Sequence, residues 1–131
     1  MPLMQKILLI GLGGGLGAIL RYYLGGYVQQ QAANNFTFPI GTVGVNLLGC
    51  LVIGLLSELA ETRSLFTPET RLFVFIGLLG GFTTFSTFGN ESVNLLRDGE
   101  NRLAFGYVAL HVFGGLGAVW LGRILADLIW R

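Results

Sequence analysis

Long stretches without charge dominate this chain, and each is close to the length that crosses a membrane. They cover residues 7–20, 40–57, 72–90 and 103–122. A transmembrane helix needs about 20 apolar residues, so the first stretch reaches spanning length only if its helix continues past Arg21 to about Val28. We therefore expect four transmembrane helices, at about residues 5–28, 38–60, 70–96 and 102–130. They would form one all-α membrane domain covering residues 1–131.

The composition supports this assignment. Of 131 residues, 53% are hydrophobic and only 11% are charged, whereas soluble domains carry roughly 25% charged residues. A soluble enzyme is therefore not expected, and four spans leave no room for a catalytic domain. The net charge of +1 provides no basic field for nucleic acid. The single cysteine, Cys50, forms neither an intrachain disulfide nor a multi-thiolate metal site.

The basic residues divide almost evenly between the two ends of the predicted helices. If the helices alternate in direction, one membrane face holds Lys6, Arg63, Arg71, Arg123 and Arg131. The other face holds Arg21, Arg97 and Arg102. Such a small difference is a weak orientation signal under the positive-inside rule. The chain is therefore a candidate for insertion in both orientations.

Glycines spaced four residues apart predict close contacts between helices, because they let two backbones approach. The pairs are Gly11/Gly15, Gly13/Gly17 and Gly77/Gly81. Packing within one chain is the simpler explanation for any single pair, and contact between two copies is the alternative.

The third predicted helix contains an unusual run, Gly80-Gly81-Phe82-Thr83-Thr84-Phe85-Ser86-Thr87-Phe88. Two glycines followed by hydroxyl and β-branched residues form a poor helix, so we expect a break there. Backbone groups freed inside a membrane must bond to protein, ion or water. A break would therefore offer carbonyl oxygens to a cation.

Polar side chains and phenyl rings follow this break on neighbouring faces. Hydroxyls and amides recur at helical spacing at Thr83, Ser86/Thr87, Asn90 and Asn94, and rings occur at Phe85 and Phe88. The edge of a phenyl ring is positive, so ring edges beside such donors can replace the hydration of an anion without holding it too tightly. The alternative is that the hydroxyls bond to their own helix and the rings face lipid.

A few other polar residues lie at membrane depth, where each needs a partner or a task. Asn46 is the strong polar group of the second helix, as a pore amide or an interhelical hydrogen bond. Glu91 is the carboxylate closest to a span centre; it could pair with Arg21, lie in a water-filled vestibule or mark the interface. On the fourth helix, Tyr107 and His111 lie one turn apart, and a lone histidine there is more often a packing residue than a ligand.

Together these residues carry a resemblance to a known family. The string at residues 80–88 with Glu91, the spacing Gly41-Thr42 to Asn46 to Gly49, and Gly17-Ala18 to Arg21-Tyr22 resemble the CrcB/Fluc family of fluoride channels. The resemblance implies an antiparallel, dual-topology homodimer with two pores in a prokaryotic cell (inner) membrane. Such a channel would export fluoride passively from the cytoplasm and lower its toxicity.

The resemblance also implies roles for individual residues. The expected fluoride pathway comprises the ring edges of Phe85 and Phe88 and the polar groups of Asn46, Ser86, Thr87 and Tyr107. Arg21 and Glu91 would lie in a vestibule. The backbone carbonyls of Gly80 and Thr83, from both subunits, would bind a buried structural sodium ion.

The fourth helix departs from the family pattern. His111 and Gly115 stand one and two turns after Tyr107, where serine is common in the family. We include His111 in the expected pathway, where it could donate to fluoride, gain charge in acid or only pack.

Two other classes of protein share features with this sequence. A small multidrug transporter is also a four-helix dual-topology dimer, but its proton coupling needs a buried carboxylate in the first helix, and this one has none. A non-transporting membrane scaffold would need neither the break nor the donors.

Overall fold

The computed structural model describes residues 1–32 and 37–130. In this part of the chain four helical spans are long and apolar enough to cross a membrane: Leu3–Gln31, Ile40–Arg63, Pro68–Arg97 and Asn101–Ile129. The prediction of an all-helical, four-span protein is confirmed. Arg131 lies outside the described residues.

The first two spans are single α-helices, and the other two are composite. α1 is Leu3–Gln31 and α2 is Ile40–Arg63. The third span consists of α3 (Pro68–Arg71), the π-helical stretch η1 (Leu72–Leu79), α4 (Gly80–Phe82) and α5 (Phe85–Arg97). The fourth consists of α6 (Asn101–Ala109), the π-helical stretch η2 (Leu110–Gly114) and α7 (Gly115–Ile129).

The first helix ends three residues later than its hydropathy predicted. The Gln29 side chain finds polar partners at the start of the next span: its Nε2 donates to the Phe38 carbonyl at 3.2 Å, and its Oε1 accepts from the Gly41 amide at 3.0 Å. The Gly41 amide belongs to the first turn of α2, where amides have no partner within the helix. Gln29 therefore joins the end of α1 to the start of α2.

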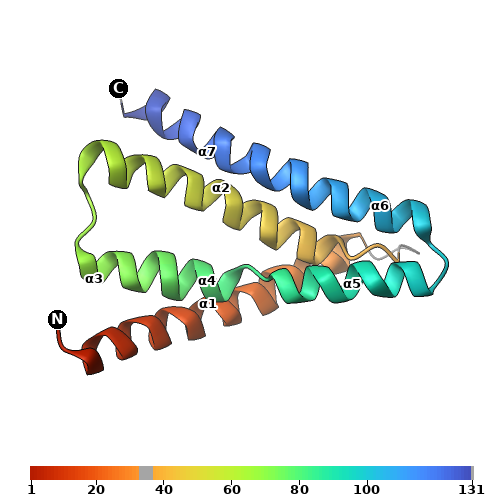
Figure 1. Ribbon diagram of the computed structural model, residues 1–131, viewed down its shortest axis with the longest axis horizontal. Coiled ribbons are helices and arrows are strands. Elements are labelled where there is room, and N and C mark those ends of the chain that lie inside the picture. Colours follow the sequence, from red (N-terminus) through yellow and green to blue (C-terminus); the bar gives the residue numbers. More distant parts are fainter. Residues whose placement is uncertain (33–36, 131) are drawn as a thin grey trace.

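The spans run back and forth, so both chain ends lie at the same end of the molecule (Figure 1). α2 packs along α7, and α1 crosses the span formed by α3, η1, α4 and α5. α5 packs against α6 at the opposite end. There Tyr107 is fully buried among Val43, Leu95 and Ala104.

Glycines make the close contact between α1 and the third span. A Cβ on Gly13 would collide with the Phe73 carbonyl, and one on Gly17 with the Leu78 carbonyl. On the other side, a Cβ on Gly81 would collide with the Gly14 carbonyl. The pairs Gly13/Gly17 and Gly77/Gly81 therefore face each other within one chain, whereas Gly11 and Gly15 have open space.

α2 and α7 approach equally closely. A Cβ on Gly54 would collide with the Val119 carbonyl, and one on Gly122 with the Leu51 carbonyl. Beyond Gly122, Arg123 on α7 donates to Glu58 and to both carboxylate oxygens of Glu61 on α2, at 3.0–3.1 Å. Glycine contacts and this ion-pair cluster hold the two helices together at one end of the bundle.

The outer surface is apolar, as expected of a surface that faces lipid. On α1 the exposed side chains include Leu12, Leu16 and Ile19, and on α7 they include Leu116 and Trp120. A water-exposed monomer rarely carries so large an apolar surface. The fold thus has a small core and a wide hydrophobic exterior.

The glycine contacts lead to a prediction about stability. Gly17→Ala should destabilise the fold by about 1–3 kcal/mol, the usual cost of overpacking, because the added methyl meets the backbone of the third span. Gly15→Ala, on the same helix but facing open space, is the matched control. Unfolding of detergent-solubilised protein by titration with a denaturing detergent measures the difference. Equal stability of the two variants would contradict this packing.

Candidate functional site

The third span is interrupted at its midpoint by two residues in extended conformation. α4 ends at Phe82, Thr83 has ψ 157°, Thr84 has φ −149° and ψ 116°, and α5 begins at Phe85. The Thr84 hydroxyl accepts a hydrogen bond from the Thr87 amide at 3.2 Å. Threonine is a favoured N-cap residue, so the local sequence starts a new helix here.

Asn46 on α2 bonds the interrupted backbone from the side. Its Oδ1 accepts from the Thr84 amide at 2.9 Å, and its Nδ2 donates to the Thr84 carbonyl at 3.1 Å. The side-chain amide thereby satisfies both backbone groups of one extended residue, as a neighbouring β-strand would. Asn46 is only 9% exposed, so this bonding is made in a site shielded from solvent.

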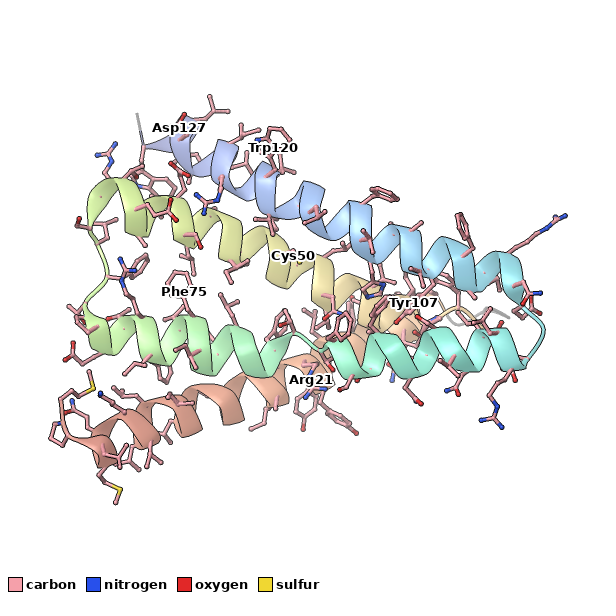
Figure 2. The ribbon with its side chains drawn as sticks, in the orientation of Figure 1. Arg21, Cys50, Phe75, Tyr107, Trp120 and Asp127 are labelled. Atoms are coloured by element: carbon pink, nitrogen blue, oxygen red, sulfur yellow. The ribbon has the colours of Figure 1, made fainter. Side chains whose placement is uncertain are left out.

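Arg21 bonds the other side of the interruption. Its Nε donates to the Gly81 carbonyl at 3.1 Å, and Figure 2 shows Arg21 beside the junction of α4 and α5. This differs from the expected position near one membrane face, because α1 crosses the third span close to the span's midpoint. Arg21 therefore donates a hydrogen bond to a carbonyl of α4 that the interruption leaves without its helical partner.

His111 is bonded at both ring nitrogens. Its Nε2 lies 3.1 Å from Asn46 Nδ2, and its Nδ1 lies 3.1 Å from the Tyr107 carbonyl. A carbonyl only accepts hydrogen bonds, so Nδ1 carries the proton and Nε2 accepts from Asn46. Because Nδ2 also donates to the Thr84 carbonyl, both hydrogens of the Asn46 amide have acceptors.

Glu91 on α5 joins two other spans. One carboxylate oxygen accepts from the Tyr107 hydroxyl at 2.5 Å, and the other accepts from the Thr42 hydroxyl at 3.1 Å. Glu91 therefore does not pair with Arg21, which was one of the three possibilities left open for it. Arg21 bonds Gly81 instead. This three-span contact lies one helical turn from His111.

The two phenylalanines of the motif have different surroundings. The Phe88 ring stacks on Tyr107 with centroids 5.7 Å apart, and its centroid lies 4.5 Å from that of His111. Phe85 is 83% exposed, and its ring contacts Phe88 with centroids 5.3 Å apart. Phe88 thus belongs to the polar cluster of the chain, whereas Phe85 projects beyond it.

The expected polar stripe is shorter than predicted. Thr83 is extended rather than helical, so it does not continue the helical face of Ser86 and Thr87, and its hydroxyl bonds back to Leu79 at 3.0 Å. Ser86 and Thr87 instead contact the Thr84 hydroxyl at 3.3 and 3.0 Å. The helical-spacing argument was wrong at Thr83 because it placed the break before this residue, whereas the helix resumes only at Phe85.

These groups border one cavity of about 570 Å³. Its polar wall is formed by Asn46, Thr83, Thr84 and His111, with Phe85 and Phe88 beside them. The remaining wall is apolar and includes Cys50 on α2 and Phe75 on η1, both labelled in Figure 2. Gly80 also borders this cavity.

Neither Arg21, Glu91 nor Tyr107 is among the residues that border the cavity. Tyr107 and Glu91 instead form the adjacent part-buried contact with Thr42. Thr42 was missed as a site residue. Its position one turn before Asn46 on the same helix is the signal that could have found it.

The side chains that border the cavity are polar, aromatic and apolar. Within residues 1–32 and 37–130 no three histidine, cysteine or carboxylate side chains gather as a metal-ion cluster. The site instead combines an amide, hydroxyls, an imidazole and phenyl rings around an apolar cavity. Such groups can solvate a small ion after its water is removed.

Comparison with known proteins agrees with this picture. The family model described as "CrcB-like protein, Camphor Resistance (CrcB)" matches residues 8–123. A protein named fluoride-specific ion channel FluC from Chloroflexus aurantiacus is 50% identical over 119 residues, which are 91% of this chain and 93% of that protein.

Two further relatives carry similar names. Fluoride-specific ion channel FluC 1 of Methanosarcina acetivorans is 48% identical over 124 residues, 94% of this chain and 92% of that protein. Fluoride-specific ion channel FluC of Methylobacillus flagellatus is 42% identical over 125 residues, 95% and 97% of the two chains. All three names describe ion channels and not enzymes. Since the family model and these relatives cover nearly all of the chain, this multi-pass membrane protein belongs to the CrcB-like family.

Proposed function

We propose that this protein is a fluoride-selective ion channel that exports fluoride passively from a prokaryotic cell through the inner membrane, lowering its internal concentration. The observation that carries the proposal is the similarity, over nearly the whole chain, to proteins named fluoride-specific ion channels. The site supports it, because hydrogen-bond donors and phenyl rings border one cavity lined by the second, third and fourth spans.

The proposed pathway follows the contact chain around this cavity. Ring edges of Phe85 and Phe88 would face the ion, with hydrogen bonds from Asn46, Ser86, Thr87 and Tyr107. His111 would add one once a second proton makes its Nε2 a donor. The positive edge of a ring attracts an anion without the full charge that would trap it. Glu91 and Arg21 would lie in a vestibule.

We further propose that two copies form an antiparallel, dual-topology homodimer. Four spans are few to surround a pore, and the cavity that holds the polar wall is bordered on one side by the exposed Phe85. A second copy would cover that ring. The near balance of basic residues between the two ends is compatible with insertion in either orientation.

A structural sodium ion completes the proposal, and the hydrogen bonds at the interruption favour it. In a continuous helix each carbonyl accepts from the amide four residues later. The Thr84 amide, which would bond Gly80, donates to Asn46, and the Thr87 amide, which would bond Thr83, donates to the Thr84 hydroxyl. Gly80 and Thr83 therefore keep carbonyl oxygens available, and such oxygens suit an alkali cation.

The rival transport class lacks support in this fold. A proton-coupled multidrug transporter needs a carboxylate buried in its first span, and α1 contains no acidic residue. A scaffold without transport would need neither the interruption of the third span nor the donors that follow it. The fluoride channel remains the function that the site supports best.

Purified protein in liposomes should release fluoride passively. With no proton gradient imposed, fluoride loaded into vesicles should flow out when a potassium ionophore balances the charge, and chloride should stay inside. A fluoride electrode measures the efflux. Fluoride retention equal to that of protein-free vesicles would refute the channel, and release that requires a proton gradient would indicate a coupled transporter.

The ring edges should be essential to that flux. Phe85→Ile and Phe88→Ile should each slow fluoride efflux by about tenfold or more, since each removes an interaction of about 1 kcal/mol or more with the ion and disturbs its neighbouring donors. Phe105→Ile is the matched control, because Phe105 is 79% exposed on α6 and does not border the cavity. Size-exclusion profiles check that all variants assemble. Normal flux in Phe88→Ile would exclude the proposed pathway.

Antiparallel assembly predicts that both ends of the chain are reached from both sides of the membrane. Cysteine tags added after Arg131, in a Cys50→Ser background, should be labelled by an impermeant reagent in intact cells to about half of the total seen after lysis. Labelling that is complete or absent in intact cells would mean a single orientation and would contradict the antiparallel dimer.

A further inference from the structure

Of the hydrogen bonds that the Asn46 amide makes, the bond to His111 is the one that opens most easily. Asn46 Nδ2 donates one hydrogen to the Thr84 carbonyl and the other to His111 Nε2, both at 3.1 Å. The bond to Thr84 has a companion in the Thr84 amide, which donates to Oδ1. The bond to His111 has no such companion, so it can open without disturbing the interruption of the third span.

This bond exists only while the imidazole is neutral. His111 Nδ1 carries the proton that bonds the Tyr107 carbonyl, so a second proton would go to Nε2. Nε2 would then be a donor facing another donor, Asn46 Nδ2. Two donors cannot stay this close, so the pair must separate, and each then needs an acceptor because an unsatisfied buried polar group costs about 1–3 kcal/mol.

We propose that fluoride inserts between the Asn46 amide and the protonated His111 ring, so that this pair binds a proton and a fluoride ion together. The inference rests on the proposed fluoride pathway. Fluoride accepts one hydrogen bond from Asn46 Nδ2 and one from His111 Nε2, while Nδ1 keeps its bond to Tyr107. Both residues border the cavity, so the ion reaches the pair without crossing the core.

The surroundings permit this step. The Phe88 ring lies against the imidazole, with centroids 4.5 Å apart. The titratable and charged groups near His111 are Cys50 on α2, Glu91 on α5, Tyr107 on α6 and, beyond the interruption, Arg21 on α1. Glu91 accepts from Tyr107 and Thr42, so its charge lies near the ring without bonding to it.

For transport, the consequence is that the site holds fluoride too strongly to release it in acid. While the imidazole is neutral, Asn46 is the only donor of this pair and holds an anion weakly, whereas a fixed positive charge in a site of low dielectric constant holds it strongly. An ion that cannot leave stops the ions behind it. Fluoride flux through the wild-type protein is therefore lower in acid than in neutral solution.

Because the chain has a single histidine, its ring nitrogens can be observed directly. The test uses full-length protein labelled with ¹⁵N-histidine in lipid nanodiscs, in sodium fluoride or in sodium chloride of equal concentration, titrated from about pH 8 to about pH 5.5 across the usual range of histidine. In chloride at high pH we expect the neutral ring with its proton on Nδ1. At a given acid pH, fluoride should raise the ratio of protonated to neutral ring about tenfold, a typical coupling between two bound ligands.

Several outcomes would overturn the inference. They are a neutral ring protonated on Nε2, a protonated fraction that is the same in fluoride and chloride, and a ring that stays neutral in fluoride throughout the titration. The proposed channel is judged separately, by fluoride efflux at neutral pH. Efflux without a fluoride effect on the ring would leave the channel standing and remove only the shared site.

Flux measurements with a matched variant give the second readout. His111→Gln keeps an acceptor for Asn46 but cannot become a cation, so the ratio of its efflux at neutral pH to that in acid should fall to about one. The same ratio should stay above one in wild type and in Phe105→Ile, whose ring does not border the cavity. Protein-free vesicles at each pH correct for leakage of uncharged hydrogen fluoride. A ratio that is equal in wild type and His111→Gln would contradict this retention of fluoride in acid.

Discussion

The bonding of the interrupted backbone at Thr83 and Thr84 is the constraint on which the rest of this structure depends. In a membrane interior each unsatisfied backbone group costs several kcal/mol, so a helix can break only where neighbours replace its lost bonds. Asn46 bonds both backbone groups of Thr84, the Thr84 hydroxyl bonds Thr87, and Arg21 bonds Gly81. Removing the Asn46 amide would leave two groups of one residue without these partners.

The glycines of α1 are part of the same arrangement, although they lie away from the cavity. Arg21 reaches the Gly81 carbonyl only because α1 crosses the third span in backbone contact, and Gly13 and Gly17 allow that approach. Arg21 lies one turn after Gly17 on α1. The glycines thus set the distance between the backbones of α1 and the third span, and at that distance the Arg21 guanidinium reaches Gly81.

The sequence predicted the coarse architecture well, because spans and glycine contacts depend on local pattern. Four apolar stretches became four spans, and the glycine pair at residues 13 and 17 packs inside the chain. The partners of polar side chains depend on how spans are rotated and tilted, which local pattern does not contain. Arg21 therefore lies at mid-span rather than near a membrane face, and Glu91 bonds Thr42 and Tyr107 rather than Arg21.

The polar groups of the site satisfy one another, and this bears on how an ion could pass. Among the described residues no buried side-chain nitrogen or oxygen atom lacks a hydrogen-bond partner. An anion that entered would therefore exchange with an existing bond, such as that between Asn46 and His111, and would gain only the difference between the two. Since the net gain from exchanging hydrogen bonds is about 1 kcal/mol, the site would hold the ion loosely. Because the wall is neutral and its donors already have partners, the site would select an anion and still release it.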